Sequence, residues 1–520
     1  MRVIGLGGLW DDAACAVAVD GHIVAAVEQK KIARRHVHGE TPGEAIEASL
    51  AIAKVRADNI DVVSIARPLG ESADHLLSLR VKQIFPNARL LIVDHHAAHA
   101  ASAYYASGFE QATVLTLDRA GDLRCSSRWQ ACTERLDLER ESYFPDSIGD
   151  LYGRVTEFLG FRARADEHKV QWMSAAGDGR FASVFEEILG GAASGWPSFD
   201  RAYFDRDRIG AGGFSAVFYH ALGLGDGEAA PASLRPHIAA GLQRAVEKCA
   251  VSMAGTGKNL CLAGGVALNA MLVRALETSG NFSNVFVQAA AGNSGTALGA
   301  AYLGSNSPRA ALRTLSLGPS FNAEEIKQVL ENCKLSPKYL LTTTDLIQSA
   351  LKDLKDHRIL AWFQDRMEFG PRALGNRSIL ASPLDPYATE NLNSFIKHRE
   401  AFRKFAASVP AEHADHYFSY GPNARNLASV ATVRPEHRER FAPALLGEDG
   451  IRLHVVERDE NPLFHRLLSA AGDATGLPVL YNTSFNLFGD ALVCNPRDAV
   501  RSFYSSGIDA MYVGQFLLRK

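Results

Sequence analysis

Two histidines and an acid form the first group of residues in this sequence that could carry chemistry. His95 and His99 begin a predicted helix directly after the apolar strand LLIVD, so both imidazoles project from one helix face about 6 Å apart. Asp118 ends the next predicted strand, ATVLTLD, where a third ligand can converge. Two imidazoles and one carboxylate suit a divalent metal such as iron. Spacing alone favours solvated or core-capping histidines, and the strand-end placement of the helix and of Asp118 makes a metal site equally consistent with the sequence.

Glycine-rich turns after two predicted strands form the second group. LAGGVALNA (262–270) and AGNSGTALGAA (291–301) each place glycines before a predicted helix. Backbone N–H groups there can approach a phosphate without a Cβ in the way, and a helix N-terminus favours an anion. The alternative is that these glycines serve packing alone. The predicted nucleotide-binding residues are Gly264, Gly265, Asn269, Asn293 and Gly295.

Cations and amides gather in the last third of the chain. RMEFGPRALGNRSIL (366–380) contains Arg372 and Arg377, and IKHREAFRKF (396–405) contains Lys397. Arg forks bind phosphate in bidentate fashion, and Lys adds a point charge. VLYNTSFN (479–486) places Asn482 at a strand end, where it can bind an amide or a base edge. The alternatives are a solvated basic surface and an ordinary strand exit.

Predicted α/β elements position these groups. The first thirty residues read as strands, helices are predicted at 42–54 and 73–84, and strand, acid and turn recur at 112–122. The recurrence indicates either two copies of one α/β unit or two unrelated hairpins. Strands and helices alternate through 230–305. The Gly-, Ser- and Pro-rich stretch 304–322 is the best linker candidate, and helices are predicted beyond it at 323–333 and 345–356.

Composition narrows the class of protein. Hydrophobic residues make up 47% and charged residues 22% of 520 residues, as in soluble globular proteins. The net charge of −3 gives no bulk basic field, so no nucleic-acid partner is expected. Seven irregularly spaced cysteines argue against a disulfide framework. No signal peptide or membrane helix is predicted, so we expect a cytoplasmic protein, with its oligomeric state left open.

Several motifs in order resemble one family nearly end to end. They are HHAAHAASAYYASGF, LCLAGGVALNA, AGNSGTALGAA, MEFGPRALGNRSIL, IKHREAFRKFAASV, NPLFHRLL, TGLPVLYNTSFN, VCNPRDAV and YSSGIDA. The chain thereby resembles the NodU-type O-carbamoyltransferases, which tailor antibiotics. The resemblance implies an α/β protein: an N-terminal actin/Hsp70-like (Kae1-like) duplicated α/β domain at 1–305, a linker region at 306–335 and a C-terminal YrdC-like α/β domain at 336–520.

The resemblance also implies an activity. In that family the YrdC-like half converts carbamoyl phosphate and ATP, with Mg²⁺, to carbamoyl adenylate, and the Kae1-like half transfers the carbamoyl group near an iron. The acceptor implied by the family is a small molecule with a hydroxyl group, and for this chain an amine is a second possibility for the acceptor group. By resemblance His95, His99 and Asp118 are metal ligands. The residues implied for the carbamoyl phosphate and nucleotide pocket are Arg372, Lys397, Arg452 and Asn482.

Departures from the family pattern fall in the N-terminal half. Trp10-Asp11 occupies the place of a His-Asp pair in the family, and Gln29-Lys30-Lys31-Ile32 occupies that of an acidic Glu-Glu-Arg-Phe stretch. Gln171–Gly177 replaces a Met-Gly-Leu-Ala-Pro-Tyr-Gly loop. Asn293 replaces an aspartate that is the fourth metal ligand of the family. A neutral amide removes one negative charge, so we expect a divalent metal to be held loosely.

Three readings of function follow. The leading one is an ATP-dependent carbamoyltransferase that modifies a natural product and has an atypical transfer site. The second keeps acyl-adenylate chemistry but moves another acyl group. The third is a non-catalytic nucleotide-binding homologue that has lost its metal.

Overall fold

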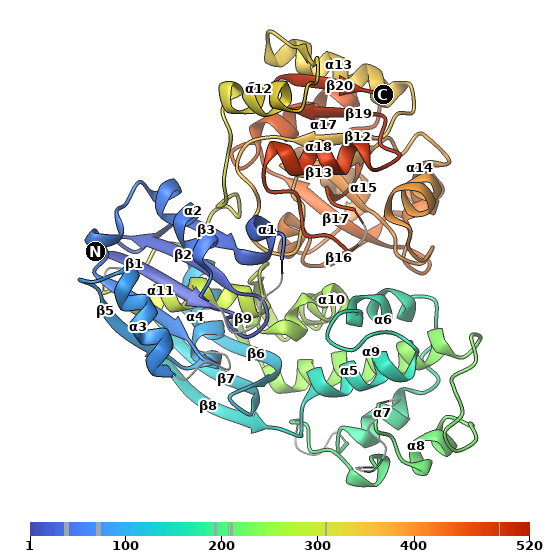
Figure 1. The fold of residues 1–520 in the computed structure, drawn as a ribbon. Coiled ribbons are helices and arrows are strands. Elements are labelled where there is room, and N and C mark those ends of the chain that lie inside the picture. The colour runs from blue at the N-terminus through green and yellow to red at the C-terminus, as the bar shows by residue number, and fades with distance from the viewer. Residues whose placement is uncertain are drawn as a thin grey trace. The chain divides into compact units, whose positions relative to one another are not determined.

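Three β-sheets flanked by helices organise the chain (Figure 1). The computed structural model describes residues 1–35, 41–68, 74–191, 195–205, 207, 212–306, 309–487 and 489–520. The chain divides into two compact units, Met1–Val93 with Asn293–Lys520, and Asp94–Gly292. The boundaries 1–305, 306–335 and 336–520 come from the family resemblance rather than from the packing of the chain, so they stay a prediction.

The first sheet has five strands in the order β3-β2-β1-β4-β5. β1 pairs antiparallel with β2 and parallel with β4, while β3 extends one edge and β5 the other. The strands are β1 (Arg2–Gly7), β2 (Ala14–Val19), β3 (His22–Glu28), β4 (Val62–Ala66) and β5 (Arg89–Val93). Apolar residues such as Ile4, Val17 and Val63 form its core.

The second sheet repeats this arrangement. Its order is β8-β7-β6-β9-β10, with β6 antiparallel to β7 and parallel to β9, so each strand has a counterpart in the first sheet. The strands are β6 (Gln111–Gly121), β7 (Arg124–Cys132), β8 (Arg135–Tyr143), β9 (Gly257–Ala263) and β10 (Phe282–Val287). The prediction of a duplicated α/β unit is therefore confirmed, and the alternative of two unrelated hairpins is wrong.

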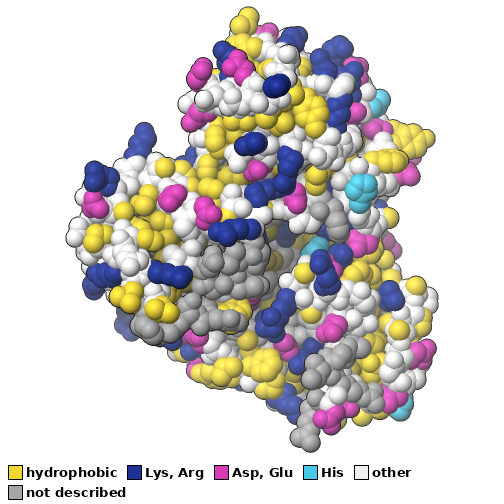
Figure 2. Space-filling view, viewed as in Figure 1, with side chains coloured by type: hydrophobic (Ala, Val, Ile, Leu, Met, Phe, Trp, Pro, Cys, Tyr) yellow, Lys and Arg dark blue, Asp and Glu magenta, His cyan; other side chains and the backbone are white. Residues whose placement is uncertain are grey.

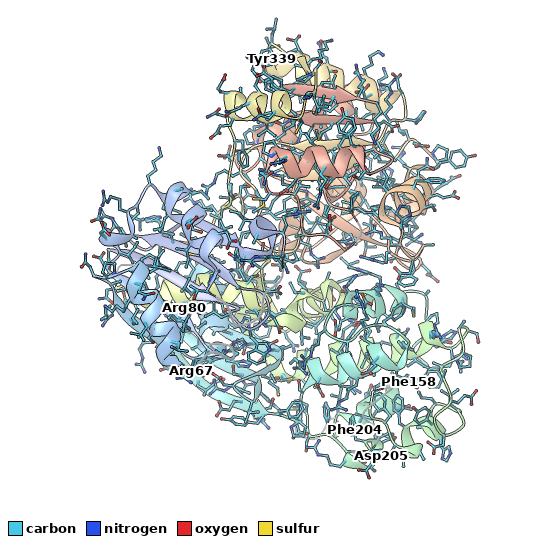
Figure 3. The ribbon with its side chains drawn as sticks, viewed as in Figure 1. Arg67, Arg80, Phe158, Phe204, Asp205 and Tyr339 are labelled. Atoms are coloured by element: carbon cyan, nitrogen blue, oxygen red, sulfur yellow. The ribbon has the colours of Figure 1, made fainter. Side chains whose placement is uncertain are left out.

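Helices cover both sheets, each within its own unit. The first sheet has α1 (Gln29–Ala33), α2 (Gly43–Ala53), α3 (Asp74–Ile84) and, after the chain returns, α11 (Thr296–Gly304). The second unit has α4 (His95–Ser107), α5 (Ile148–Phe158), α6 (Glu167–Ser174), α7 (Ala182–Ile188), α8 (Ala216–Ala221), α9 (Arg235–Ala254) and α10 (Ala270–Thr278). Phe158 and Phe204 belong to an aromatic cluster in its helical part (Figure 3).

The C-terminal part of the first unit is built on a ten-stranded mixed sheet, ordered β11-β20-β19-β12-β13-β18-β14-β17-β16-β15. Tyr339 in β11 marks one edge (Figure 3). The strands are β11 (Lys338–Tyr339), β12 (Leu360–Phe363), β13 (Arg377–Ala381), β14 (Ala406–Pro410), β15 (Phe418–Ser419), β16 (Val430–Val433), β17 (Gly450–Val456), β18 (Leu480–Ser484), β19 (Ala510–Val513) and β20 (Phe516–Arg519). Both faces are covered, because Leu360 and Trp362 belong to one apolar cluster and Ala361 and Phe363 to another.

Helices of this part include those predicted at 323–333 and 345–356. They are α12 (Ala323–Asn332), which lies inside the predicted linker region, α13 (Thr343–Lys355), α14 (Ala388–Asn391), α15 (Ala411–Tyr417), α16 (Arg438–Phe441), α17 (Pro462–Thr475) and α18 (Pro496–Tyr504). Acidic and basic side chains are interspersed over the face in Figure 2. Among the described residues, every helix is too short or too polar to cross a bilayer.

Candidate functional site

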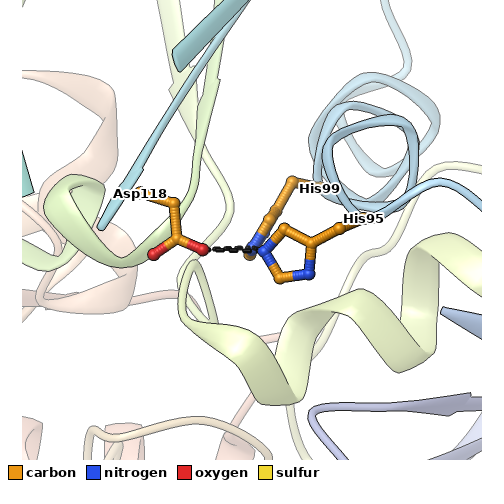
Figure 4. Close-up of side chains that lie close together, drawn as sticks. All are labelled: His95, His99 and Asp118. Atoms are coloured by element: carbon orange, nitrogen blue, oxygen red, sulfur yellow. Dashed lines mark hydrogen bonds and ion pairs between the residues drawn. The ribbon is translucent and has the colours of Figure 1, made fainter. Parts of the chain in front are cut away.

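His95, His99 and Asp118 converge inside the second unit, as predicted (Figure 4). His95 Nε2 lies 2.7 Å from Asp118 Oδ2, and His99 Nε2 lies 3.1 Å from His95 Nε2 and 3.5 Å from the same carboxylate oxygen. One possible ligand atom from each residue falls within 4.8 Å of the other two. All three side chains are removed from solvent. The arrangement brings two nitrogens and one oxygen to a common point.

The start of α4 is fixed by Asp94 and Arg124. Asp94 caps the helix, accepting a hydrogen bond from Ala97 N at 2.8 Å, and Arg124 Nη1 donates to the same Asp94 oxygen at 2.8 Å. His96 is turned to other partners and makes hydrogen bonds with Thr116 Oγ1 at 2.6 Å and with the Arg124 carbonyl at 3.0 Å. These contacts orient the helix face that carries His95 and His99.

A bulge in β6 aims Asp118 at the histidines. The strand continues to Gly121 rather than ending at Asp118 as predicted, and its register with β7 shifts between Leu117 and Gly121. A Cβ at Gly121 would lie 2.0 Å from His95 Cδ2, so only glycine fits there. Gly264 has φ +94° and packs on the Leu117 backbone, which a Cβ would meet at 2.2 Å.

The donor set fits a divalent metal. Burial disfavours the charged form of Asp118, but hydrogen bonds and charge from His95 and His99 outweigh it and hold the pKa of Asp118 well below its usual range. An ionised carboxylate beside two imidazoles is a ligand set that iron and similar ions accept. His95, His99 and Asp118 would hold such an ion.

The predicted nucleotide-binding residues fall in both units. Gly265 opens a short 3₁₀ turn, and a Cβ there would lie 3.1 Å from Asp118 Oδ1. Asn269 caps α10 by accepting hydrogen bonds from Met271 N and Leu272 N at 3.1 and 3.0 Å, so its amide oxygen serves local structure. Asn293 and Gly295 form a 3₁₀ turn before α11 in the other unit. Their nucleotide role, and Asn293 as a metal ligand, stay predictions.

A second group of polar residues lies on the ten-stranded sheet. Ala406 in β14 pairs in register with Arg452 in β17 on one side and with Asn482 in β18 on the other. Residues paired in this way direct their side chains to the same face of a sheet. Asn482 Nδ2 donates to the Ala373 carbonyl at 3.2 Å, which brings the loop carrying Arg372 to that face.

The charges of this group suit an anion, and we call Arg372, Lys397, Arg452 and Asn482 together the anion site, as the sequence predicts. Loss of solvent, followed by the charges of Arg372, Arg399 and Arg403, lowers the pKa of Arg452 well below its usual range. Loss of solvent, followed by Arg399 and Arg403, does the same to the pKa of Lys397. An anion bound among such cations would offset their mutual repulsion.

Neutral oxygens hold Lys397 in this group. It ends a π-helical turn, Leu392–Lys397, and its ammonium donates to the Ser484 carbonyl at 2.5 Å and to Asn486 O and Oδ1 at 3.0 and 2.8 Å. None of these partners carries a negative charge. No carboxylate among these partners neutralises Lys397, while its three N–H groups already have acceptors, so Lys397 can act on a phosphate through its charge.

The amide of Asn482 has a fixed orientation. Its Nδ2 donates to Ser408 Oγ at 3.1 Å as well as to Ala373 O, and Ser408 Oγ lies 3.0 Å from His454 Nδ1. Burial lowers the pKa of His454 to about 3, so its ring is neutral. Asn482 is 2% exposed, and within the described parts of the chain its Oδ1 accepts no hydrogen bond. The site thus presents a buried acceptor beside a group of cations.

Arg377 differs from the cations of the anion site. Its guanidinium donates to the backbone carbonyls of Gln364, Asp365 and Pro319 and stacks on the Phe363 ring with 3.6 Å between Cζ and the ring centroid. Arg377 therefore stabilises the loop against the sheet, and it is not grouped with Arg372 in the anion site. Sequence reasoning did not single out Arg399 and Arg403, although both fall in the basic segment 396–405 that it identified.

Two of the departures from the family pattern, Trp10 and the segment Gln171–Gly177, lie away from the anion site in the sequence. Trp10 lies in the turn between β1 and β2 and is 36% exposed. Residues 171–174 of the segment Gln171–Gly177 belong to α6, where Trp172 and Met173 are buried. The segment is therefore mainly helix rather than loop.

Comparison with known families gives two matches. The family described as "Carbamoyltransferase N-terminus" matches residues 69–302, and that described as "Carbamoyltransferase C-terminus" matches residues 351–520. The first range contains the His–Asp cluster and the second contains the anion site.

Several relatives match most of the chain. Nodulation protein NolNO of Sinorhizobium fredii is 31% identical over 98% of this chain and 79% of its own length, and nodulation protein NolO of Bradyrhizobium diazoefficiens is 34% identical over 82% and 79%. The 3'-hydroxymethylcephem-O-carbamoyltransferase of Streptomyces clavuligerus is 33% identical over 51% of this chain and 49% of its own length. Among solved structures, HypF of T. kodakarensis is 17% identical over 58% of this chain and 47% of its own, with a TM-score of 0.34.

Proposed function

This chain belongs to the NodU-type carbamoyltransferase family, and from that premise we propose an ATP-dependent enzyme that carbamoylates a small molecule through a carbamoyl adenylate. Membership makes the chain a carbamoyltransferase. The co-substrates, carbamoyl phosphate and ATP with Mg²⁺, the intermediate and the acceptor belong to the proposal. The observation that carries it is the anion site, where Arg452 and Asn482 leave one face of the sheet on either side of Ala406 and the amide oxygen of Asn482 is buried without a hydrogen bond among the described residues.

Carbamoyl phosphate matches that site chemically. Its phosphate is a dianion, which the guanidinium groups of Arg372 and Arg452 can bind by charge-assisted hydrogen bonds and which the charge of Lys397 attracts. Its –NH₂ group is a donor, which the orphaned Oδ1 of Asn482 can accept. Inorganic phosphate satisfies only the first requirement.

The atom balance of the proposal fixes the order of steps. Water displaces phosphate from carbamoyl phosphate to give carbamate, whose oxygen attacks the α-phosphorus of ATP. The bond to the β-phosphate breaks, and pyrophosphate leaves. The acceptor hydroxyl or amine then attacks the carbamoyl carbon, loses its proton and releases AMP. Bound cations stabilise the charge that develops on the phosphoryl oxygens.

The His–Asp cluster is assigned to the transfer step. His95, His99 and Asp118 would hold a divalent metal, which supplies a Lewis acid for a carbonyl or phosphoryl oxygen. The cephem relative is named as an O-carbamoyltransferase of 3'-hydroxymethylcephem, which supports a small-molecule hydroxyl as acceptor here.

Pyrophosphate release tests the proposal. The purified chain with ATP should release pyrophosphate only when carbamoyl phosphate is added, and acetyl phosphate should not replace it. Release with acetyl phosphate alone would favour transfer of another acyl group. No release with either compound would favour a non-catalytic homologue.

A further inference from the structure

Helix α1 of the first sheet docks on two loops of the ten-stranded sheet, within the same unit. Its Ile32 packs against a small apolar cluster composed of Met367, Ala373, Leu492 and Cys494. One of the loops precedes β13 and carries Arg372, and the other follows β18. The contact therefore reaches the loop that carries Arg372 and the loop that follows the strand of Asn482.

Lys31 attaches α1 to the Arg372 loop. Its ammonium donates to the Glu368 and Gly370 carbonyls at 2.9 and 2.6 Å and forms an ion pair with Glu28. Glu28 Oε2 in turn accepts a hydrogen bond from Gly370 N at 3.1 Å. Lys31 and Glu28 are each 3% exposed, so removal of either charge would leave the other buried without a counter-charge.

The Arg372 loop is also closed on itself. Glu368 Oε1 accepts hydrogen bonds from the backbone N–H groups of Leu374, Asn376 and Arg377 at 2.8, 2.8 and 3.2 Å. Arg372 lies between these two ends. A displacement of the backbone at 368–370 is thus passed directly to Arg372.

Arg34, just after α1, attaches the other loop. Its Nη1 donates to the Ala491 and Leu492 carbonyls at 2.9 and 3.0 Å, and its Nη2 lies 3.2 Å from Asp490 Oδ2. The Asp490 carbonyl accepts a hydrogen bond from Asn486 Nδ2 at 2.7 Å, and Asn486 Oδ1 accepts one from Lys397. This chain of hydrogen bonds ends at the second cation of the anion site.

We propose that Lys31 and Arg34 are positioning residues for carbamoyl phosphate: from the N-terminal sheet they fix the two loops that orient Arg372 and Lys397. The inference rests on the proposed function of the anion site. Neither residue touches the substrate; each acts through backbone atoms of the loop that it holds. The N-terminal residues are thereby part of the machinery that binds the substrate of the C-terminal half.

Kinetics of the full chain test this inference. In carbamoyl-phosphate-dependent pyrophosphate release at saturating ATP, Lys31→Met should raise KM for carbamoyl phosphate about 10- to 100-fold, because a displacement of about 1 Å at a binding group has effects of that size. The kcat should change little, since saturating substrate restores the loop. Lys31→Arg should return KM to the wild-type value.

Lys30 provides the matched control on the same helix. Its ammonium pairs with Asp12 Oδ1 at 2.6 Å and takes no part in holding either loop. Lys30→Met should therefore leave KM unchanged. Equal KM values for Lys31→Met and Lys30→Met, with wild-type release intact, would overturn the inference while leaving the proposed function standing.

Glu28→Gln covers the case in which Lys31→Met does not fold. The amide keeps an acceptor for Gly370 N but removes the charge that holds Lys31, so KM should again rise. A KM equal to that of the wild type would overturn the inference. Absence of carbamoyl-phosphate-dependent release by the wild type would instead contradict the proposed function.

Discussion

Arg452 and Asn482 lie on either side of Ala406 in the ten-stranded sheet, each paired with it in register. Neighbouring strands are about 4.8 Å apart, so the two side chains leave one face of the sheet about 10 Å from each other. The small side chain of Ala406 stands between them, and the proposed ligand would lie over it. A ligand that contacts both residues needs an anionic group for the Arg452 cation at one end and a hydrogen-bond donor for the Asn482 amide oxygen at the other.

Removal of a cation should abolish the first half-reaction. Arg372→Ala and Lys397→Ala should each lower carbamoyl-phosphate-dependent pyrophosphate release about 30- to 1,000-fold, because one charge-assisted contact to an anion in a desolvated site contributes about 2–4 kcal/mol. Initial rates measured with purified variants check this.

Arg458→Ala is the control for these two variants. Its side chain is 76% exposed and lies 3.8 Å from Glu412, so release should be unaffected. Normal turnover of both Arg372→Ala and Lys397→Ala would contradict the assignment of the anion site.

The amide of Asn482 should distinguish carbamoyl from acetyl phosphate. Acetyl phosphate replaces –NH₂ by –CH₃ and leaves Oδ1 unpaired, so the wild type should bind it about 10- to 100-fold more weakly. Asn482→Leu should bind both compounds with similar affinity, as measured by calorimetry. Ser408→Ala removes one of the two acceptors that orient the amide and should reduce the preference in the same direction, by less.

Thr483→Val is the matched control for Asn482→Leu. Thr483 is the next residue of β18, so its side chain leaves the opposite face of the sheet. It should keep the full preference for carbamoyl phosphate. A preference that survives in Asn482→Leu would show that another group recognises the –NH₂.

His454 should make the fold less stable in acid. Its folded-state pKa of about 3 is below the ordinary 6.5, so the folded chain binds fewer protons between these values and loses stability as pH falls from about 6.5 towards 3. At pH 5 the loss from this group is about 2 kcal/mol. His454→Asn keeps an acceptor for Ser408 and should abolish that part of the pH dependence, as measured by denaturant unfolding at pH 8 and pH 5. Identical pH dependence in both proteins would contradict it.

Asn293 should limit metal binding if it stands where the family has an aspartate. We expect the purified protein to carry less than one equivalent of iron, and Asn293→Asp to raise the occupancy, because a carboxylate at ligand distance attracts a dication more strongly than an amide does. Elemental analysis after dialysis measures both, with the exposed Asn284→Asp as control. Full occupancy in the wild type, unchanged by Asn293→Asp, would show that Asn293 is not a ligand.

The sequence predicts best where one local pattern decides the structure. Spacing alone predicts the shared helix face of His95 and His99, and the structure adds Asp94 as the cap at which that helix begins. The convergence of Asp118 depends on a bulge in β6, which no local signal reveals. The prediction that Asp118 ends a strand was wrong for this reason, although the residue itself was chosen correctly for the cluster.

Long-range pairing explains what sequence patterns miss in the anion site. Arg372 and Arg377 look equivalent in the sequence, yet Arg377 begins β13 and is buried against backbone carbonyls and Phe363. The contact of Lys31 with Glu368 joins residues 337 positions apart. Neither contact follows from a repeating pattern in the sequence, so neither can be predicted until the pairing of the strands is known.

The central claim is that the anion site makes carbamoyl adenylate, and an isotope label on the carbonyl carbon of carbamoyl phosphate tests it most directly. Incubation of the purified chain with labelled carbamoyl phosphate and ATP, without acceptor, should place the label on a nucleotide with the release of pyrophosphate, and Arg372→Ala should prevent it. Pyrophosphate release without label on the nucleotide, or label on the nucleotide in Arg372→Ala at the wild-type rate, would contradict the claim.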